Sequence, residues 1–556
     1  MRGGFVACAG AQPGGLEQAA ERLRWHRGQA FFHHGSGITI AGFRDVIEGP
    51  FAENRAGVTF FAHGGVPAPL AQHRERGRRF VAIECDGGLL RVSRDPIGLA
   101  PVFFRILGSS VWLATEAAPL LWLGNPGPDV DALAARAAFA PMDERTGWLG
   151  VHRVLPGSTL EVDLSTLATR SVRYWLPERL FGTYRGSYRA AVDEFGARFR
   201  SAVERSVDAR YAILLSGGID SAAVALTPPL QVPPLPAPHT PHLVHVHYAD
   251  LPQTHEQQYA KEVALRVGAP LHVLPGETTP WDIDAELDMH GMPYNWLPYG
   301  MDEPPLAHIA AQGIGVALDG HDGDGVLGAP GRAIWGSLLL EGEVGRLVEL
   351  TRKYGIRRAA RGLAADFVPP MLRPRRTLRP TQMQLFAGYF KSPLSARIAQ
   401  DDLHRWGRPR ALWRARQLQP LLPRAVISFE QKEIEAARYG IDLRHPFADR
   451  ELIEFLITLP CAIKSDPMRA KPVLVDALAS VLPASIHRRR KSDYMAALRQ
   501  RISPARCAQV IQTSNVRLPH IDYVRLFADC DVHAESIPLH FLVNLARLHH
   551  FARRVA

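Results

Sequence analysis

Residues 211–225 read YAILLSGGIDSAAVA, an apolar run that breaks at two glycines and resumes as small, helix-forming residues. The pattern recurs, because further short β-prone runs, LVHVHYA, PLHVLP and IGVALDG, follow along the chain, the first two separated by the helical segment EQQYAKEVALRVG. Strands that alternate with helices usually pair in parallel, and a parallel sheet is buried on both faces. The central part of the chain is therefore expected to be α/β, with a parallel sheet.

The length of 556 residues exceeds what one hydrophobic core usually organises, which predicts two or more domains. Before residue 180, short β-prone runs are separated by glycine-rich turns. FVAIEC and LLRVSRD flank an Asp-Gly-Gly turn, and FFRIL and VWLATE flank a Gly-Ser-Ser turn, so both pairs predict hairpins. We expect residues 1–180 to form an antiparallel β-sandwich domain and residues 185–556 a second domain, with a parallel sheet and many helices.

Composition excludes several classes of protein. With 46% hydrophobic and 22% charged residues the chain is typical of globular proteins. It contains neither a run of roughly 18 apolar residues nor an apolar start long enough for a secretion signal, so we expect a cytoplasmic protein without a membrane partner. The five cysteines include no CxxC pair, which predicts buried apolar residues rather than disulfides or a zinc site.

The formal charge of +10 comes largely from arginine, in clusters such as RPRR at 373–376 and RWGRPRALWRAR at 405–416. Such clusters could attract nucleic acid, phosphorylated ligands or an acidic peptide, or could form a solvated face. No RNA-binding or helix-turn-helix motif accompanies them, so a nucleic-acid partner is not expected.

The turn Ser216-Gly217-Gly218 follows a predicted strand and precedes a predicted helix. Ligands of parallel sheets bind at this edge, and two glycines allow several N–H groups to converge on phosphate oxygens. The turn matches neither the Walker nor the dinucleotide motif. Asp220 would repel a phosphate unless a cation lay between the two, and Mg²⁺ would suit that position. The alternative is a glycine turn with an acid at a helix start and no ligand.

A second strand runs into an acidic turn, LDGHDGDGVLG at 318–328. So many carboxylates are costly together unless they bind a cation or are well solvated. Asp324 is the candidate for a second magnesium ligand. An EF-hand is disfavoured, because the DxDxDG spacing and the terminal glutamate are missing.

Four motifs, SGGIDS, LDGHDGDGVLG, LRHPFADRELIEF and LPASIHRRRK, resemble in this order the synthetase domain of the asparagine synthetase superfamily. FVAIECDGGLLRVSRDPIGLAPVFFR and VWLATE resemble its glutaminase-like domain, including the turn Arg94-Asp95-x-x-Gly98. The resemblance implies an ATP pyrophosphatase, in which a carboxylate attacks the α-phosphorus of ATP and an amine then converts the acyl-adenylate into an amide. The implied cofactors are ATP and Mg²⁺.

The resemblance also assigns roles by motif. Asp220 and Asp324 match the magnesium ligands, and Lys491 matches the lysine that stabilises negative charge at the α-phosphate and the developing oxyanion. The remaining positions match the pyrophosphate-binding loop: Ser216, Gly217, Gly218, Asp220 and Ser221.

The glutaminase-like domain departs from relatives that use glutamine. They begin Met-Cys, whereas residue 2 here is arginine, and Cys8 lies inside a predicted strand without an α-amino group beside its thiol. Glutamine hydrolysis is therefore not expected, residues 1–180 are expected to be a retained scaffold, and the amine must arrive with the substrate.

Relatives with that property include the β-lactam and carbapenam synthetases and the lasso peptide cyclases. At position 321, where the β-lactam synthetases use a tyrosine in their base, His321 is either the catalytic base or a hydrogen-bonding residue of the turn. LRHPFADRELIEF is most similar to the lasso peptide cyclases. This implies a macrolactam-forming enzyme acting on a ribosomal precursor peptide, with a leader-binding partner protein.

A threaded peptide would need a roomy cavity with mobile walls. Candidate walls are the proline-rich segment 228–241 and residues 290–305, where Tyr294, Trp296 and Tyr299 could pack against a peptide or form a buried cluster. The rival functions are a β-lactam synthetase-like enzyme, an ammonia-dependent asparagine synthetase, a silent scaffold protein and a basic nucleic-acid binder.

Overall fold

The structure is a computed structural model. It describes the residues in the following ranges: 3–10, 14–23, 29–44, 52–63, 67–76, 79–138, 143–227, 240–276, 280–294, 303–328, 334–367, 388–391, 423–488, 501–533, 537 and 539–556. Several predictions fall outside these ranges, namely those on Lys491, on Trp296 and Tyr299, on both arginine clusters and on most of the proline-rich segment.

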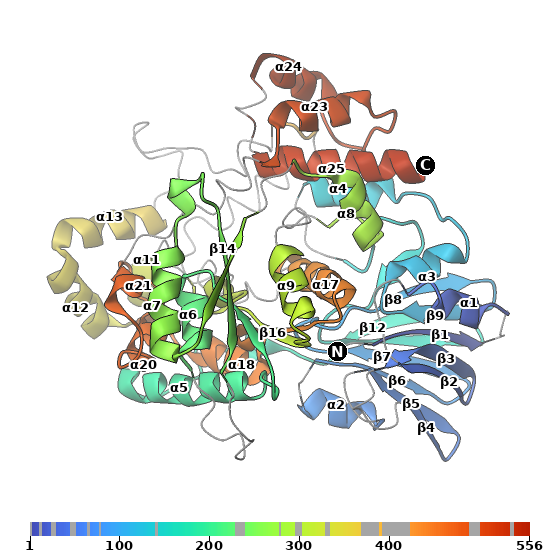
Figure 1. Cartoon of the computed structure of the whole chain (residues 1–556), viewed down its shortest axis with the longest axis horizontal. Helices are drawn as coiled ribbons and strands as arrows, with labels where there is room; N and C mark the ends of the chain where they lie inside the picture. Colours follow the sequence, from blue (N-terminus) through green and yellow to red (C-terminus); the bar gives the residue numbers. More distant parts are fainter. Residues whose placement is uncertain are drawn as a thin grey trace.

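The N-terminal part contains two six-stranded antiparallel sheets, seen on the right of Figure 1. The first has the order β10-β8-β9-β1-β3-β2, with strands β1 (Gly4–Gly10), β2 (Gln29–His34), β3 (Ile38–Arg44), β8 (Phe103–Leu107), β9 (Ser110–Ala114) and β10 (Val151–Arg153). The second has the order β12-β11-β7-β6-β5-β4, with strands β4 (Ala52–Arg55), β5 (Val58–His63), β6 (Val81–Cys85), β7 (Leu89–Arg94), β11 (Ser158–Asp163) and β12 (Thr169–Arg173). Both predicted hairpins, β6–β7 and β8–β9, are present.

Strand β1 explains why the two sheets stack. Side chains alternate along a strand, and Phe5, Ala7 and Ala9 pack in the core shared with the second sheet. Val6 and Cys8 point the other way, into a core that includes helices. These helices are α1 (Leu16–Ala20), α3 (Ala117–Trp122) and α4 (Val130–Ala137), whereas α2 (Leu70–Arg76) lies near β6. Strand β1 is therefore buried on both faces of the first sheet.

The C-terminal part is built on a five-stranded parallel sheet in the order β15-β14-β13-β16-β17. Its strands are β13 (Ala212–Leu214), β14 (His242–His247), β15 (Leu271–Pro275), β16 (Val316–Leu318) and β17 (Asp442–Arg444). The first four coincide with predicted strands, whereas β17 was not predicted. Because all five run in parallel, their carboxyl ends lie along one edge.

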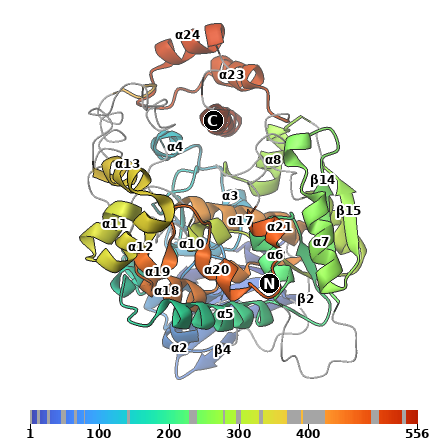
Figure 2. The same ribbon diagram turned by 90° about the vertical axis from the view of Figure 1, so that its left-hand side faces the viewer.

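Helices cover both faces of this sheet (Figures 1 and 2). One face packs against α5 (Tyr188–Glu204), α6 (Ile219–Ala225), α7 (Gln257–Val267), α18 (Arg450–Thr458) and α20 (Pro472–Ala477). The other packs against α9 (Glu303–Ala311) and α17 (Pro423–Arg438). The predicted fold class, an antiparallel β-sandwich followed by a parallel sheet with helices, is confirmed.

The remaining helices surround these layers. They are α8 (Ile283–His290), α10 (Gly323–Leu327), α11 (Ile334–Leu340), α12 (Val344–Tyr354), α13 (Ile356–Phe367), α19 (Cys461–Lys464), α21 (Ala484–Arg488), α23 (Pro504–Thr513), α24 (Tyr523–His533) and α25 (Leu539–Val555), with short 3₁₀ turns η1 (Pro177–Leu180), η2 (Pro252–Thr254) and η6 (Pro446–Ala448). Within the described ranges, no helix combines the length and apolarity needed to cross a bilayer.

All five cysteines are buried with free thiols, as the sequence predicted. Burial raises the pKa of Cys8 to about 11, although a hydrogen bond with Ser110 works in the opposite direction. A thiol with so high a pKa is a poor nucleophile at neutral pH. Tyr294 is also buried, at 1% exposure, and its ring meets His290 edge-on. The structure thus supports the buried-cluster alternative for Tyr294.

Candidate functional site

The turns that follow β13 and β16 touch each other at the carboxyl edge of the parallel sheet. A Cβ atom on Gly323 would lie 2.4 Å from Asp220 Oδ1, and one on Gly320 would lie 2.5 Å from the backbone nitrogen of Ser221. Since real Cβ atoms do not approach so closely, glycine is required at both positions. The glycines of the acidic turn therefore allow the two predicted parts of the site to meet.

Serine hydroxyls hold the glycine turn in shape. Gly217 has φ 87°, in the left-handed region, and Gly218 N–H donates to Ser216 Oγ at 3.1 Å. Ser216 N–H in turn donates to Ser221 Oγ, also at 3.1 Å, and the two hydroxyls lie 3.0 Å apart. Two of the N–H groups expected to face a phosphate are thus bonded to serine oxygens within the loop. A phosphate bound here would have to exchange with these hydroxyls or bond to them.

A lysine that sequence reasoning missed lies between the two aspartates. Lys471 Nζ is 2.5 Å from both carboxylate oxygens of Asp220 and 2.7 Å from Asp324 Oδ1. Its side chain is 2% exposed, whereas those of Asp220 and Asp324 are 21% and 49% exposed. The two carboxylates thus point toward one position, and an ammonium group occupies the place that the sequence reasoning gave to Mg²⁺.

The backbone of Lys471 is unusual as well. It has φ 48° at the start of α20, directly before Pro472. A left-handed conformation is uncommon for residues other than glycine and persists where surrounding structure imposes it. One signal could have pointed to Lys471, because only seven of the 65 basic residues of the chain are lysines. Since lysine and arginine are not interchangeable where a compact ammonium is needed, these seven lysines form a short set of candidates that includes Lys471.

Asp319 organises the residues behind the site. It directly follows β16, and its Oδ1 accepts hydrogen bonds from His445 Nδ1 at 2.6 Å and from His321 N–H at 3.0 Å. Lys432 Nζ lies 3.5 Å from its other oxygen. Burial alone would raise the pKa of Asp319, but His445 and Lys432 outweigh it and hold the pKa well below its usual range. Asp319 is therefore ionised and fixes His445, a residue of the LRHPF motif.

The surroundings of His321 bear on its predicted role. Its Nε2 lies 2.7 Å from Ser428 Oγ, and its ring meets Phe429 edge-on at 5.2 Å between centroids. Burial first, and Lys432 second, lower the pKa of His321 from 6.5 to about 3. A general base works best when its pKa is near the operating pH, so this imidazole has little affinity for a proton at pH 7. These contacts favour the second interpretation, that His321 is a hydrogen-bonding residue.

Helix α17 connects this site to the N-terminal β-sandwich. It carries Ser428 and Lys432, which contact His321 and Asp319, and between them Glu430, which is fully buried. Arg94 donates to Glu430 Oε1 at 3.0 Å, and Arg153 to Glu430 Oε2 at 3.3 Å. Two arginines of the β-sandwich thus bind the helix that supports the site.

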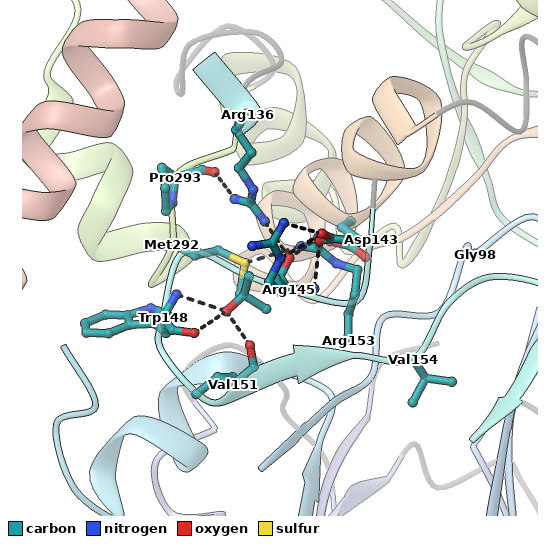
Figure 3. A network of polar contacts seen from close by, with 12 residues as sticks. Gly98, Arg136, Asp143, Arg145, Trp148, Val151, Arg153, Val154, Met292 and Pro293 are labelled. Carbon is teal, nitrogen blue, oxygen red and sulfur yellow. Dashed lines mark hydrogen bonds and ion pairs between the residues drawn. The ribbon is translucent and has the colours of Figure 1, made fainter. Parts of the chain in front are cut away.

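The two arginines are themselves held by backbone atoms. Arg94 donates to the carbonyl oxygens of Gly98 and Val154, within the Arg-Asp-x-x-Gly turn and next to β10. Arg153 extends from β10 toward the carbonyl oxygen of Arg145 and the sulfur of Met292 (Figure 3). The turn that the sequence singled out in the N-terminal β-sandwich therefore holds α17 in place.

Residues 194–518 match the family described as "Asparagine synthase". This span is more than half of the chain and contains both touching turns, Lys471 and helix α17. The chain belongs to the asparagine synthase family.

One relative is "Amidase chyE" of Penicillium rubens, which is 29% identical over 173 residues. The aligned part is 30% of this chain, and the chain spans only 25% of that protein. Two solved structures have low TM-scores to this member of the asparagine synthase family. "Structure of the allosteric regulatory enzyme of purine biosynthesis" gives 0.22, at 12% identity over 50% of this chain and 81% of the other. Glutamine phosphoribosylpyrophosphate amidotransferase from B. subtilis gives 0.23, at 11% identity over 50% and 82%. Scores this low support no inference.

Proposed function

We propose that this chain is an ATP-dependent, amide-forming enzyme whose reaction takes place at the touching turns after β13 and β16. The observation that carries the proposal is the convergence of Asp220 and Asp324 on one buried ammonium, at the sheet edge where parallel folds bind ligands. Membership of the asparagine synthase family supports the use of ATP. In this proposal residues 185–556 form the catalytic domain and residues 1–180 the scaffold that holds α17.

The residues between the turns fit a cation. Asp220 and Asp324 offer carboxylate oxygens, the ligands that Mg²⁺ prefers, and an ammonium already lies between them. These two residues would hold Mg²⁺, which would offset the negative charge of the triphosphate. The exposed fraction of Asp324, 49%, leaves that carboxylate accessible from solvent.

Three groups of this chain act on the phosphates in the proposed reaction. The loop Ser216–Ser221 binds the pyrophosphate portion through its hydroxyls and N–H groups. Lys471 turns its ammonium from the two aspartates toward the phosphate oxygens, where it stabilises the charge of the transition state. Lys491, which lies outside the described residues, takes the role that its motif implies, at the α-phosphate and the oxyanion.

The reaction proceeds in two steps. A substrate carboxylate oxygen bonds to the α-phosphorus while the bond to the pyrophosphate oxygen breaks, giving an acyl-adenylate and pyrophosphate. The nitrogen of an amine then attacks the acyl carbon and AMP departs, while the proton of the amine passes to a base or to solvent. The low proton affinity of His321 argues against assigning this base to its imidazole.

We further propose that both reactants belong to one ribosomal precursor peptide, so that the product is a macrolactam of the lasso peptide type. The LRHPFADRELIEF motif supports this substrate class. The burial and raised pKa of Cys8 also support it, because such a thiol is poorly suited to hydrolyse glutamine and the amine of the peptide would take the place of released ammonia. A leader-binding protein would deliver the peptide. Family membership equally favours the rival reaction, ammonia-dependent formation of asparagine.

A substrate panel tests this proposal. A precursor peptide with an Asp or Glu several residues after its N-terminal glycine should release AMP and pyrophosphate and lose one water, as measured by mass spectrometry. The same peptide with an acetylated N-terminus should support ATP–pyrophosphate exchange but give no ring. If free aspartate and ammonium give asparagine while every peptide is inert, the rival reaction replaces the cyclase. Absence of AMP with both substrate classes would contradict the amide-forming activity itself.

A further inference from the structure

Three histidines meet at the other end of the parallel sheet. His242 is the first residue of β14, His272 is the second residue of the edge strand β15, and His308 lies in α9. Because β14 and β15 run parallel to β13 and β16, this position near their amino ends is opposite the edge that carries Asp220 and Asp324. The three histidines, named here the histidine cluster, play no part in the proposed reaction.

The rings of the histidine cluster are close enough to share a ligand. The Nε2 atoms of His242 and His308 are 3.1 Å apart, and the rings of His242 and His272 stack with 3.9 Å between centroids. One ring nitrogen from each residue lies within 4.8 Å of the others. A tetrahedral zinc ion with Zn–N bonds of about 2.0–2.1 Å keeps its nitrogen ligands about 3.4 Å apart. The 3.1 Å between His242 and His308 is close to that spacing, and the stacked rings of His242 and His272 would have to rotate to bind one ion together.

The chemistry of the cluster indicates which ions would bind. Its members are imidazoles alone, and all three are partly exposed. Imidazole nitrogen suits zinc and other first-row transition metals, whereas Mg²⁺ and Ca²⁺ require oxygen ligands. Burial first, and the other two rings second, lower the pKa of His242 to about 4, with a smaller contribution from Arg210. Burial also lowers the pKa of His308, so these two rings favour the neutral form that binds a metal.

We propose that His242, His272 and His308 form a binding site for a divalent transition-metal ion, with Zn²⁺ the expected occupant. Three imidazole nitrogens bind the ion, and the partial exposure of the rings leaves a fourth position for water. The ion ties the edge strand β15 to β14 and to α9, which covers one face of the sheet. The site is independent of the proposed amide-forming reaction.

The test is zinc binding by the full-length chain after removal of bound metals, in the presence of excess Mg²⁺ so that the acidic residues at the opposite edge are occupied. Calorimetric titration with Zn²⁺ should show one site more in the wild type than in His272→Asn and in His308→Asn. His33→Asn, a substitution in β2 far from the cluster in the fold, is the matched control and should bind zinc as the wild type does. Zinc should raise the melting temperature of the wild type and of the control only.

A second measurement shows whether the cluster variants lose zinc because they misfold. Far-ultraviolet circular dichroism without metal should be the same for all four proteins. Co²⁺ added in place of Zn²⁺ should give the visible absorption bands of a tetrahedral site in the wild type, and neither cluster variant should show them. Equal zinc stoichiometry in the wild type and both cluster variants would overturn the proposal. Cobalt bands that persist in those variants would do so as well.

Discussion

Two groups of three charged side chains, each brought together by the fold, differ in their exposure to solvent. At Glu430, one carboxylate lies between the two guanidinium groups of Arg94 and Arg153, and all three side chains are at most 1% exposed. At Lys471, one ammonium lies between two carboxylates that are 21% and 49% exposed. The first group, called here the Glu430 group, is buried where the β-sandwich meets helix α17. The second, the Lys471 group, is exposed to solvent on its acidic side.

The difference in exposure separates a fixed structural contact from a contact that a ligand can replace. A charge buried with its partners is costly to uncover, so the Glu430 group holds α17 in a single position. A partly exposed carboxylate can exchange its partner for a metal ion or solvent at a small cost. Helix α17 carries Glu430 and, on either side of it, residues that contact His321 and Asp319, which precede Asp324 in the acidic turn.

The largest expected effect is on stability, and it comes from removing the carboxylate of the Glu430 group. Glu430→Ala leaves two buried guanidinium groups without their carboxylate, and removing one partner of a buried ion pair typically costs about 3–5 kcal/mol. The midpoint of urea unfolding should fall accordingly. The control is Glu178→Ala, which removes an exposed ion pair with Arg173 and should cost at most about 1 kcal/mol. Equal midpoints for the two variants would contradict the structural role of Glu430.

Removing the ammonium of Lys471 should instead lower the activity. Without the ammonium of Lys471, or that of Lys491, the charge of the phosphoryl transition state is less well offset. Loss of one such electrostatic contact typically lowers kcat by a factor on the order of 10²–10³. AMP formation should fall by that factor in Lys471→Ala and in Lys491→Ala, while Lys261→Ala, an exposed substitution in α7, should remain active. Full activity of Lys471→Ala would remove it from the mechanism.

The sequence predicted many of the strands that buried side chains hold in place, but not all of those that are held mainly by backbone hydrogen bonds. The strands with clear apolar patterns, such as β6, β9 and β13, were predicted because burial of their side chains positions them. Strands β2 and β4 were missed, since they lie at sheet edges and read QAFFHH and AENR, with mostly exposed side chains. Backbone hydrogen bonds hold such edge strands in place, and these leave no hydrophobic pattern.

The site shows the same limit. The motifs predicted that Asp220 and Asp324 belong together, and the structure brings them to one ammonium. Lys471 was not predicted, because its position depends on where α20 packs and no local sequence pattern shows this. The motif indicated Lys491 instead. The histidine cluster was missed for a related reason, because its members come from three elements far apart in the sequence. Composition alone, with its scarcity of lysine, held a signal for Lys471.

The smallest expected effect concerns the pH dependence of stability through His321. Its pKa in the folded chain is about 3, below the 6.5 of an unfolded chain, so the fold prefers the neutral ring. Between these values the unfolded chain binds one more proton, and stability should fall as pH falls through this window, by about 1.4 kcal/mol per pH unit for this residue. Between pH 6 and pH 5, the unfolding free energy of His321→Gln should therefore depend less steeply on pH than that of the wild type and of His33→Asn. The difference in slope should correspond to about one proton. If His321 is the catalytic base instead, His321→Gln should retain ATP–pyrophosphate exchange but lose amide formation, and the pH slope of its stability should equal that of the wild type. That result would contradict a purely structural role for His321 beside α17.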